Sequence, residues 1–82
     1  GTSIASVLDL KKIMKHALLE DAQAMVLCHN HPSGTLRPSV NDDRITKTMK
    51  EACTTLDIRL IDHVIVTANG YYSYSDSDKL PR

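Results

Sequence analysis

One segment, an apolar run that leads into two histidines, constrains the fold of this chain more than any other. Ala24–Cys28 is short, apolar and bounded by polar residues, which predicts a buried strand that delivers His29 at its C-terminal end. Side chains alternate along a strand, so His29 and His31 should point the same way while Asn30 points away. The sequence therefore predicts two imidazoles that converge at a strand end.

The residues after this pair predict a reversal of the chain and then a helix. Pro32 ends regular strand pairing, and Ser33-Gly34 supplies a turn. Six residues separate Pro32 from Ser39, after which a helical pattern begins. Its expected apolar face consists of Ile45, Met49, Ala52, Cys53 and Leu56. Asp42 falls in the first turn of this helix, so its carboxylate can return to the two histidines as a third ligand.

Each part of this pattern also has an ordinary explanation. A His-x-His pair at a strand end is common as exposed polar sequence, and Ser39-x-x-Asp42 has the spacing of a helix capping box. The combination indicates more: His29, His31 and Asp42 lie within fourteen residues of sequence, in the order strand, turn, capped helix. Two imidazoles and one carboxylate are what a catalytic zinc uses when a fourth position stays open for water.

This pattern resembles a known family. His-x-His-Pro, six residues, then Ser-x-x-Asp is similar to the JAMM (MPN-plus) metalloprotease motif, and His-Asn-His-Pro-Ser-Gly with Pro38-Ser39 resembles its RadC branch. Residues 12–18, 60–66 and 71–73 resemble the flanking helix and hairpin of RadC-like domains. The resemblance implies one domain over residues 1–82, with an α+β fold. It also implies a small mixed sheet flanked by helices, a JAMM/cytidine-deaminase-like core, and N-terminal strands that precede this chain.

The resemblance also implies roles for individual residues. His29, His31 and Asp42 would be zinc ligands, and Ser39 would help to hold the oxygen of the tetrahedral intermediate. The implied activity is hydrolysis of peptide or isopeptide bonds in a protein or peptide substrate. The sequence departs from the family at Thr35-Leu36-Arg37, where Asp-Pro is usual, and at Asp57, where a helix-ending Gly is usual. Asp tolerates the left-handed cap conformation, so the fold is not affected.

The family's general base has no counterpart in the sequence. JAMM enzymes use a Glu on a strand before the first helix, whereas the two glutamates here are Glu20 and Glu51. Glu20 lies nine residues before His29, at the far end of the strand by about 3.3 Å per residue. Glu51 lies about 13 Å along the helix from Asp42 at 1.5 Å per residue. Since Gly1-Thr2 resembles the residues that follow the catalytic Glu, the chain is expected to be a truncated domain.

The rest of the chain predicts a simple α+β arrangement. Asp9 can cap a first helix. The apolar stripe of this helix is expected to consist of Leu10, Ile13, Met14, Ala17 and Leu18. A β-branched run from Ile58 to Thr67 predicts a strand, and Asn69-Gly70 predicts a hairpin into Tyr71–Ser75. The tyrosines should be strand residues with one exposed face, and residues 76–82 a frayed end.

Composition narrows the class of protein. Net charge is zero, so the segment shows no electrostatic footprint for nucleic acid, and with Phe and Trp absent the three tyrosines leave few stacking platforms for single strands. No signal peptide or membrane span is visible, and Cys28 and Cys53 occupy expected apolar positions as free thiols. These features favour a cytoplasmic protein.

Three functional alternatives stay open. The first is the zinc hydrolase. The second is a DNA-repair-associated domain in which a metal is structural, as the family's historical label implies, and the third is a non-catalytic partner-binding domain.

Only one of the neighbours Asp62 and His63 can face the metal cleft, where it could orient a zinc imidazole, and the alternative is a polar residue at a strand edge. His16 is expected to be a helix-surface residue.

Overall fold

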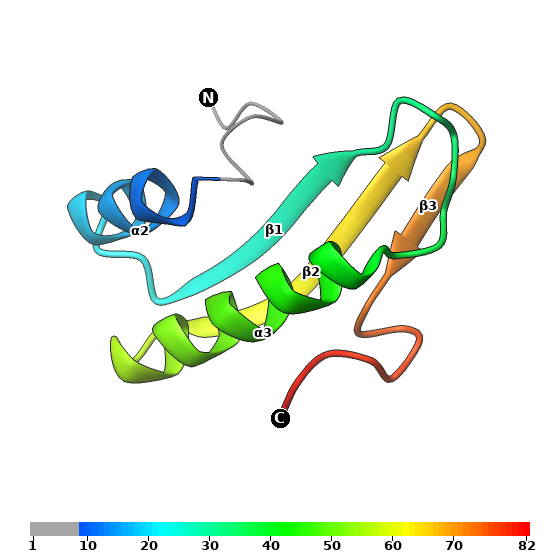
Figure 1. Cartoon of the computed structure of the whole chain (residues 1–82). Helices are drawn as coiled ribbons and strands as arrows, with labels where there is room; N and C mark the ends of the chain where they lie inside the picture. The colour runs from blue at the N-terminus through cyan, green and yellow to red at the C-terminus, as the bar shows by residue number, and fades with distance from the viewer. Residues whose placement is uncertain (1–8) are drawn as a thin grey trace.

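The computed structural model describes residues 9–82, which form two helices and a three-stranded sheet (Figure 1). The expectation that Gly1-Thr2 follows a catalytic strand lies outside the described residues. The elements in chain order are α2 (Leu10–Leu19), β1 (Ala24–Asn30), α3 (Val40–Thr55), β2 (Arg59–Thr67) and β3 (Gly70–Ser73). Strand order is β1-β2-β3, with β1 and β2 parallel and β2 and β3 antiparallel. The predicted α+β fold with a small mixed sheet is confirmed.

The first helix, α2, buries a narrower face than the sequence predicts. Asp9 caps it as expected, accepting a hydrogen bond from the backbone of Lys12 at 3.2 Å. Ile13 and Ala17 are buried, whereas Leu18 is 52% exposed. At about 100° per residue Leu18 lies at the margin of the apolar stripe, so the prediction that it packs inward is wrong.

The second helix, α3, begins where Ser39 and Asp42 form the predicted capping box. Its buried positions include Thr46, Met49 and Cys53. Leu56, predicted to be part of this apolar face, is the C-cap and is exposed, because the chain leaves the helix there. Asp57 adopts the predicted left-handed conformation, with φ of 58°.

Both helices contribute to one hydrophobic cluster with inward-facing residues of β1 and β2. Its buried members are Ile13, Ala17, Leu27, Met49, Cys53, Ile58 and Leu60. Burial of the thiol raises the pKa of Cys53, which keeps it protonated as a small apolar group. Among the helices of residues 9–82, none has the length and apolar character needed to cross a membrane.

The sheet has one buried face and one exposed face. Leu27 and His29 are buried on β1, whereas Cys28 between them is exposed. The prediction that Cys28 is an apolar-face residue is therefore wrong, since the described residues cover only one face of β1. The pairing of β1 with β2 shifts register between Met25 and Val26, where Ile61 of β2 has no partner. Beyond this point His63 and Ile65 face inward on β2, as Leu27 and His29 do on β1.

The C-terminal part of the chain is more ordered than the sequence predicts. Thr67 pairs with Gly70, so the hairpin turn consists of Ala68 and Asn69, and β3 ends at Ser73 rather than Ser75. The segment after β3 was expected to fray, yet the backbone N–H of Lys79 donates to the Tyr74 carbonyl at 2.8 Å and Leu80 packs against the core. Tyr74 is only 2% exposed, so it is a core residue rather than a half-exposed strand residue.

Candidate metal centre

The candidate metal centre lies where β1 ends and α3 begins, on the buried face of the sheet. In a β-α-β unit the helix starts at the end of the sheet where the first strand finishes, so the first turn of α3 meets the C-terminal end of β1. Three side chains converge there: His29 from β1, His31 one residue past its end, and Asp42 from the first turn of α3. One ligand atom from each lies within 4.8 Å of the other two.

Distances among these side chains fit a shared ion. His29 Nε2 lies 3.1 Å from Asp42 Oδ1, and His31 Nε2 lies 3.0 Å from Asp42 Oδ2. The imidazole rings of His29 and His31 meet edge to face, with centroids 4.8 Å apart. The predicted convergence of the two histidines and the reach of Asp42 are confirmed in position. In the described part of the chain no other group of three His, Cys, Asp or Glu side chains is placed to hold an ion.

The loop after β1 fixes the orientation of His31. His31 Nδ1 lies 2.7 Å from the Thr35 carbonyl oxygen, which can only accept a hydrogen bond, so Nδ1 carries the proton. In the neutral form of this ring the lone pair is at Nε2, which lies 3.0 Å from Asp42 Oδ2, itself an acceptor. A cation between these two acceptors would balance them, and the donor set of two imidazole nitrogens and a carboxylate suits a divalent metal such as zinc.

Glycine makes the path of this loop possible. Gly34 has φ of 84°, and a Cβ there would come within 3.1 Å of Asn69 Nδ2 in the β2–β3 turn. The loop therefore passes closely beside the hairpin (Figure 1). The His31 backbone N–H donates to the Val66 carbonyl at 3.1 Å, which ties the residue to β2 after β1 has ended.

Asp42 has a second partner at the start of α3. Its Oδ2 accepts the Ser39 backbone N–H at 2.8 Å, and its own N–H donates to Ser39 Oγ at 3.0 Å. Burial opposes ionisation, but hydrogen bonding from Ser39 to the carboxylate and the neighbouring histidines outweigh it and lower the pKa of Asp42. The capping box and the metal centre thus share one carboxylate, which stays ionised at neutral pH.

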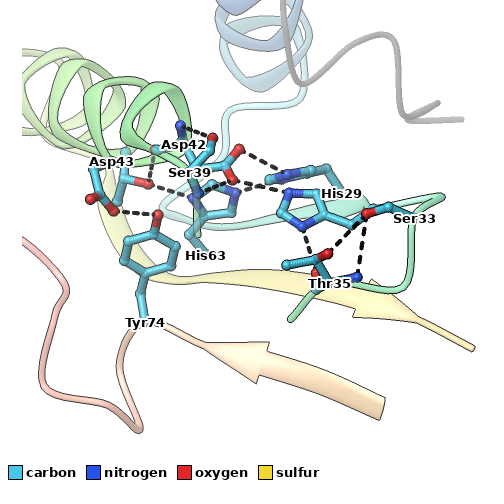
Figure 2. A network of polar contacts seen from close by, with 10 residues as sticks. His29, Ser33, Thr35, Ser39, Asp42, Asp43, His63 and Tyr74 are labelled. Carbon is cyan, nitrogen blue, oxygen red and sulfur yellow. Dashed lines mark hydrogen bonds and ion pairs between the residues drawn. The ribbon is translucent and has the colours of Figure 1, made fainter. Parts of the chain in front are cut away.

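His63 is the site residue whose role the sequence left open. Of the neighbours Asp62 and His63, His63 faces the centre: its Nε2 lies 2.8 Å from His29 Nδ1 and it is fully buried (Figure 2). Burial, reinforced by the proximity of His29, lowers the pKa of His63 to about 4, and burial also lowers the pKa of His29. Asp62 instead accepts hydrogen bonds from the backbone of His63 and from Ser73 and Ser75.

Two further residues were missed by the sequence analysis. Thr46 Oγ1 lies 2.5 Å from His63 Nδ1 and donates to the Asp42 carbonyl at 2.7 Å. Tyr74 stacks on His63 with ring centroids 4.8 Å apart and an interplanar angle of 2°, while its hydroxyl donates to Asp43 at 2.8 Å (Figure 2). For Thr46 the sequence did contain an indication, since it lies one helical turn after Asp42 and so on the same face of α3.

The remaining candidates lie away from the centre. Glu20 is the exposed C-cap of α2, and Glu51 is exposed on α3. His16 is exposed on α2, as predicted. Within residues 9–82 no glutamate belongs to the network of His29, His31 and Asp42.

Comparison with known proteins agrees with this centre. A family model described as RadC-like JAB domain matches residues 1–80. A UPF0758 protein of Streptococcus sanguinis is 45% identical over 76 residues, covering 93% of this chain and 34% of the relative. A UPF0758 protein of Flavobacterium johnsoniae is 42% identical over 76 residues, covering 93% of this chain and 33% of the relative.

A third relative extends the match slightly. A UPF0758 protein of Streptococcus gordonii is 40% identical over 80 residues, covering 98% of this chain and 35% of the relative. The chain thus spans about a third of the length of these curated relatives. The family match covers nearly the whole chain and includes every residue of the metal centre. This chain belongs to the RadC-like JAB domain family.

Proposed function

We propose that residues 1–82 form a single domain that hydrolyses peptide or isopeptide bonds in a protein substrate, with zinc held by His29, His31 and Asp42. One observation supports this most directly: His31 Nε2 lies 3.0 Å from one oxygen of the ionised Asp42 carboxylate and His29 Nε2 lies 3.1 Å from the other. When bound there, zinc would supply Lewis acidity toward a carbonyl and lower the pKa of a water. The free thiols Cys28 and Cys53 are in keeping with a reducing cytoplasm, where we place the activity.

In this proposal Ser39 acts on the substrate. Its Oγ accepts the Asp42 N–H at 3.0 Å, which leaves the hydroxyl hydrogen able to donate to an oxygen that gains negative charge. The same hydrogen bond places the hydroxyl at the N-terminus of α3, where the helix dipole favours negative charge.

The general base must differ from the two glutamates of this chain. A base needs hydrogen-bond reach to the proton that it takes, and its contribution is about 10²–10⁴ in rate. Glu20 and Glu51 are both exposed and outside the site network. We therefore expect Glu20→Gln and Glu51→Gln to leave cleavage by the intact protein unchanged, whereas His31→Ala should abolish it.

The experiment that tests the proposed function combines metal analysis with cleavage. The intact protein should bind one zinc per domain, and its cleavage of model peptide or isopeptide substrates should be lost with a chelator and restored by zinc. Zinc binding without cleavage of any such substrate would indicate a structural metal instead. Loss of cleavage in Glu20→Gln or Glu51→Gln would show that the base has been misidentified.

A further inference from the structure

We propose that Thr46 and His63 are positioning residues that fix the tautomer of His29, so that its Nε2 is presented unprotonated to a metal ion. The inference rests on the proposed metal centre, but its direct test needs no activity. It assigns a function to the inward-facing polar pair on α3 and β2, where a fold of this size would otherwise bury apolar side chains.

A backbone carbonyl, that of Asp42, fixes the direction of every other hydrogen bond in this chain of contacts. The Asp42 carbonyl can only accept, so the single hydroxyl proton of Thr46 is donated to it at 2.7 Å. Thr46 Oγ1 then has only lone pairs for His63 Nδ1 at 2.5 Å. Nδ1 of His63 must therefore carry the proton of that bond.

The protonation of His63 at Nδ1 determines which nitrogen of His29 carries the proton. A neutral imidazole protonated at Nδ1 has a lone pair at Nε2. His63 Nε2 therefore accepts from His29 Nδ1 across 2.8 Å, and His29 carries its proton on Nδ1. Its Nε2, 3.1 Å from Asp42 Oδ1, is left as an unprotonated ligand atom.

The relay gives His29 the same tautomer that the Thr35 carbonyl gives His31. Both Nε2 lone pairs then face Asp42, and both rings are held by a hydrogen bond on the opposite nitrogen. Ligating histidines in metal sites are commonly held in this way. The reverse tautomer of His29 would place a proton between Nε2 and Asp42 Oδ1, and this proton would have to leave before a metal could bind.

Packing holds the relay in place. His63 and Thr46 are both fully buried, and the Tyr74 ring lies parallel to His63 while its hydroxyl is tied to Asp43. The ring of His63 therefore has no room to rotate without displacing the stacked tyrosine. Since Thr46 and Asp42 lie on one helix, the relay also joins the orientation of His29 to the position of its neighbouring ligand.

Matched substitutions separate hydrogen bonding from packing. Thr46→Ser keeps the hydroxyl, whereas Thr46→Val keeps the shape and removes it. His63→Gln places an amide oxygen where His63 Nε2 lay, so that it can accept from His29 Nδ1. His63→Met has a similar length but offers no such acceptor. We expect Thr46→Val and His63→Met to bind zinc about 10- to 100-fold more weakly in chelator competition, and the two conservative variants to stay close to the unsubstituted protein.

The decisive measurement is the tautomer of His29 in the metal-free intact protein, read from its ring nitrogen shifts by long-range ¹H–¹⁵N NMR. The expected result is protonation at Nδ1 in the unsubstituted protein and in Thr46→Ser, with a shift toward protonation at Nε2 in Thr46→Val. Protonation of His29 at Nε2 in the unsubstituted protein overturns the proposal. Equal zinc affinity of Thr46→Ser and Thr46→Val also overturns it.

The same measurements separate this inference from the proposed hydrolase. A protein that binds zinc with the expected variant pattern but cleaves nothing keeps the relay and refutes the hydrolase. A protein that cleaves its substrate while His29 is protonated at Nε2 keeps the hydrolase and refutes the relay.

Discussion

Asp42 serves two structural purposes with one carboxylate. It closes the capping box of α3 through the Ser39 N–H, and it faces both histidines of the metal centre. The cap needs only an acceptor oxygen, whereas the metal centre needs a carboxylate that stays ionised. Burial opposes ionisation of Asp42, but hydrogen bonding from Ser39, together with the nearby histidines, lowers its pKa, so the cap favours the form that a metal binds.

Asp42→Asn separates these purposes. The amide oxygen can still accept the Ser39 N–H, and the amide nitrogen can donate to His29 Nε2, so the metal-free variant should fold normally. Zinc at about 100 times its dissociation constant should stabilise the unsubstituted protein by about 2.7 kcal/mol. Thermal unfolding with zinc and with a chelator should show this difference, and Asp42→Asn should lose it. Retention of the full zinc effect in Asp42→Asn would contradict the assigned ligand set.

Ser39 is both a helix cap and the proposed catalytic hydroxyl. Ser39→Ala should reduce the free energy of unfolding by about 1 kcal/mol, because the Asp42 N–H loses its acceptor. Ser39→Asn, which retains a good cap, should restore stability but not the cleavage rate. Denaturant unfolding and cleavage kinetics measure the two effects, with the exposed Ser77→Ala as control. Recovery of the rate in Ser39→Asn would limit Ser39 to a capping role.

Because of Tyr74, the free energy of unfolding should fall as pH rises in the alkaline range. Its burial, with the Asp43 carboxylate at its hydroxyl, raises the pKa of Tyr74 well above 10.0, the ordinary value. Above pH 10 the unfolded phenol loses a proton that the folded one retains, so stability is complete below that pH and falls as pH rises.

The slope from this one group is at most about 1.4 kcal/mol per pH unit. Unfolding of Tyr74→Phe at pH 8 and pH 11 should show a smaller loss than the unsubstituted protein, whereas the exposed Tyr71→Phe should not differ from it. The same loss in Tyr74→Phe as in the unsubstituted protein would show that Tyr74 makes no contribution.

At the scale of elements, β2 illustrates how one strand supports the core and the metal centre together. Ile65 is completely buried on the inner face, beside His63, whereas Ile61 at the register irregularity is 44% exposed. The irregularity returns His63 and Ile65 to the inner face after Leu60, since without it every later side chain would change face.

The same substitution at these two positions tests the assignment of faces. Ile65→Ala should cost about 2–5 kcal/mol of unfolding free energy, because it leaves a cavity beneath α3. Ile61→Ala should cost less than about 1 kcal/mol, since water already reaches that side chain. Denaturant titration measures both, and equal losses would mean that the faces of β2 are assigned incorrectly.

Across the molecule, α3 lies along one face of the sheet, and the metal centre lies at one end of that interface. The hydrophobic cluster occupies the part of the sheet where β1 begins, and the polar network of His29, His63 and Asp42 replaces it where β1 ends. The described residues leave the other face of the sheet with exposed apolar side chains, including Val26, Val66 and Tyr71.

The local chemistry of the centre was determined by the sequence. The alternation of a strand places His29 and His31 together, and the capping signal places Asp42 in the first turn of a helix. These features depend on contacts between residues close in the chain, so spacing alone predicts them. The same local reasoning predicted the Asp9 cap and the left-handed Asp57.

Three other features depend on how the helices and strands pack together. Whether Asp62 or His63 faces the centre depends on the register of β2 against β1 and on its irregularity at Ile61, which no local pattern specifies. The burial of Tyr74 and the exposure of Cys28 depend on which segments cover each face of the sheet. The Thr46–His63–His29 relay joins a helix and two strands that are distant in sequence, so it exists only after β1, α3 and β2 have packed together.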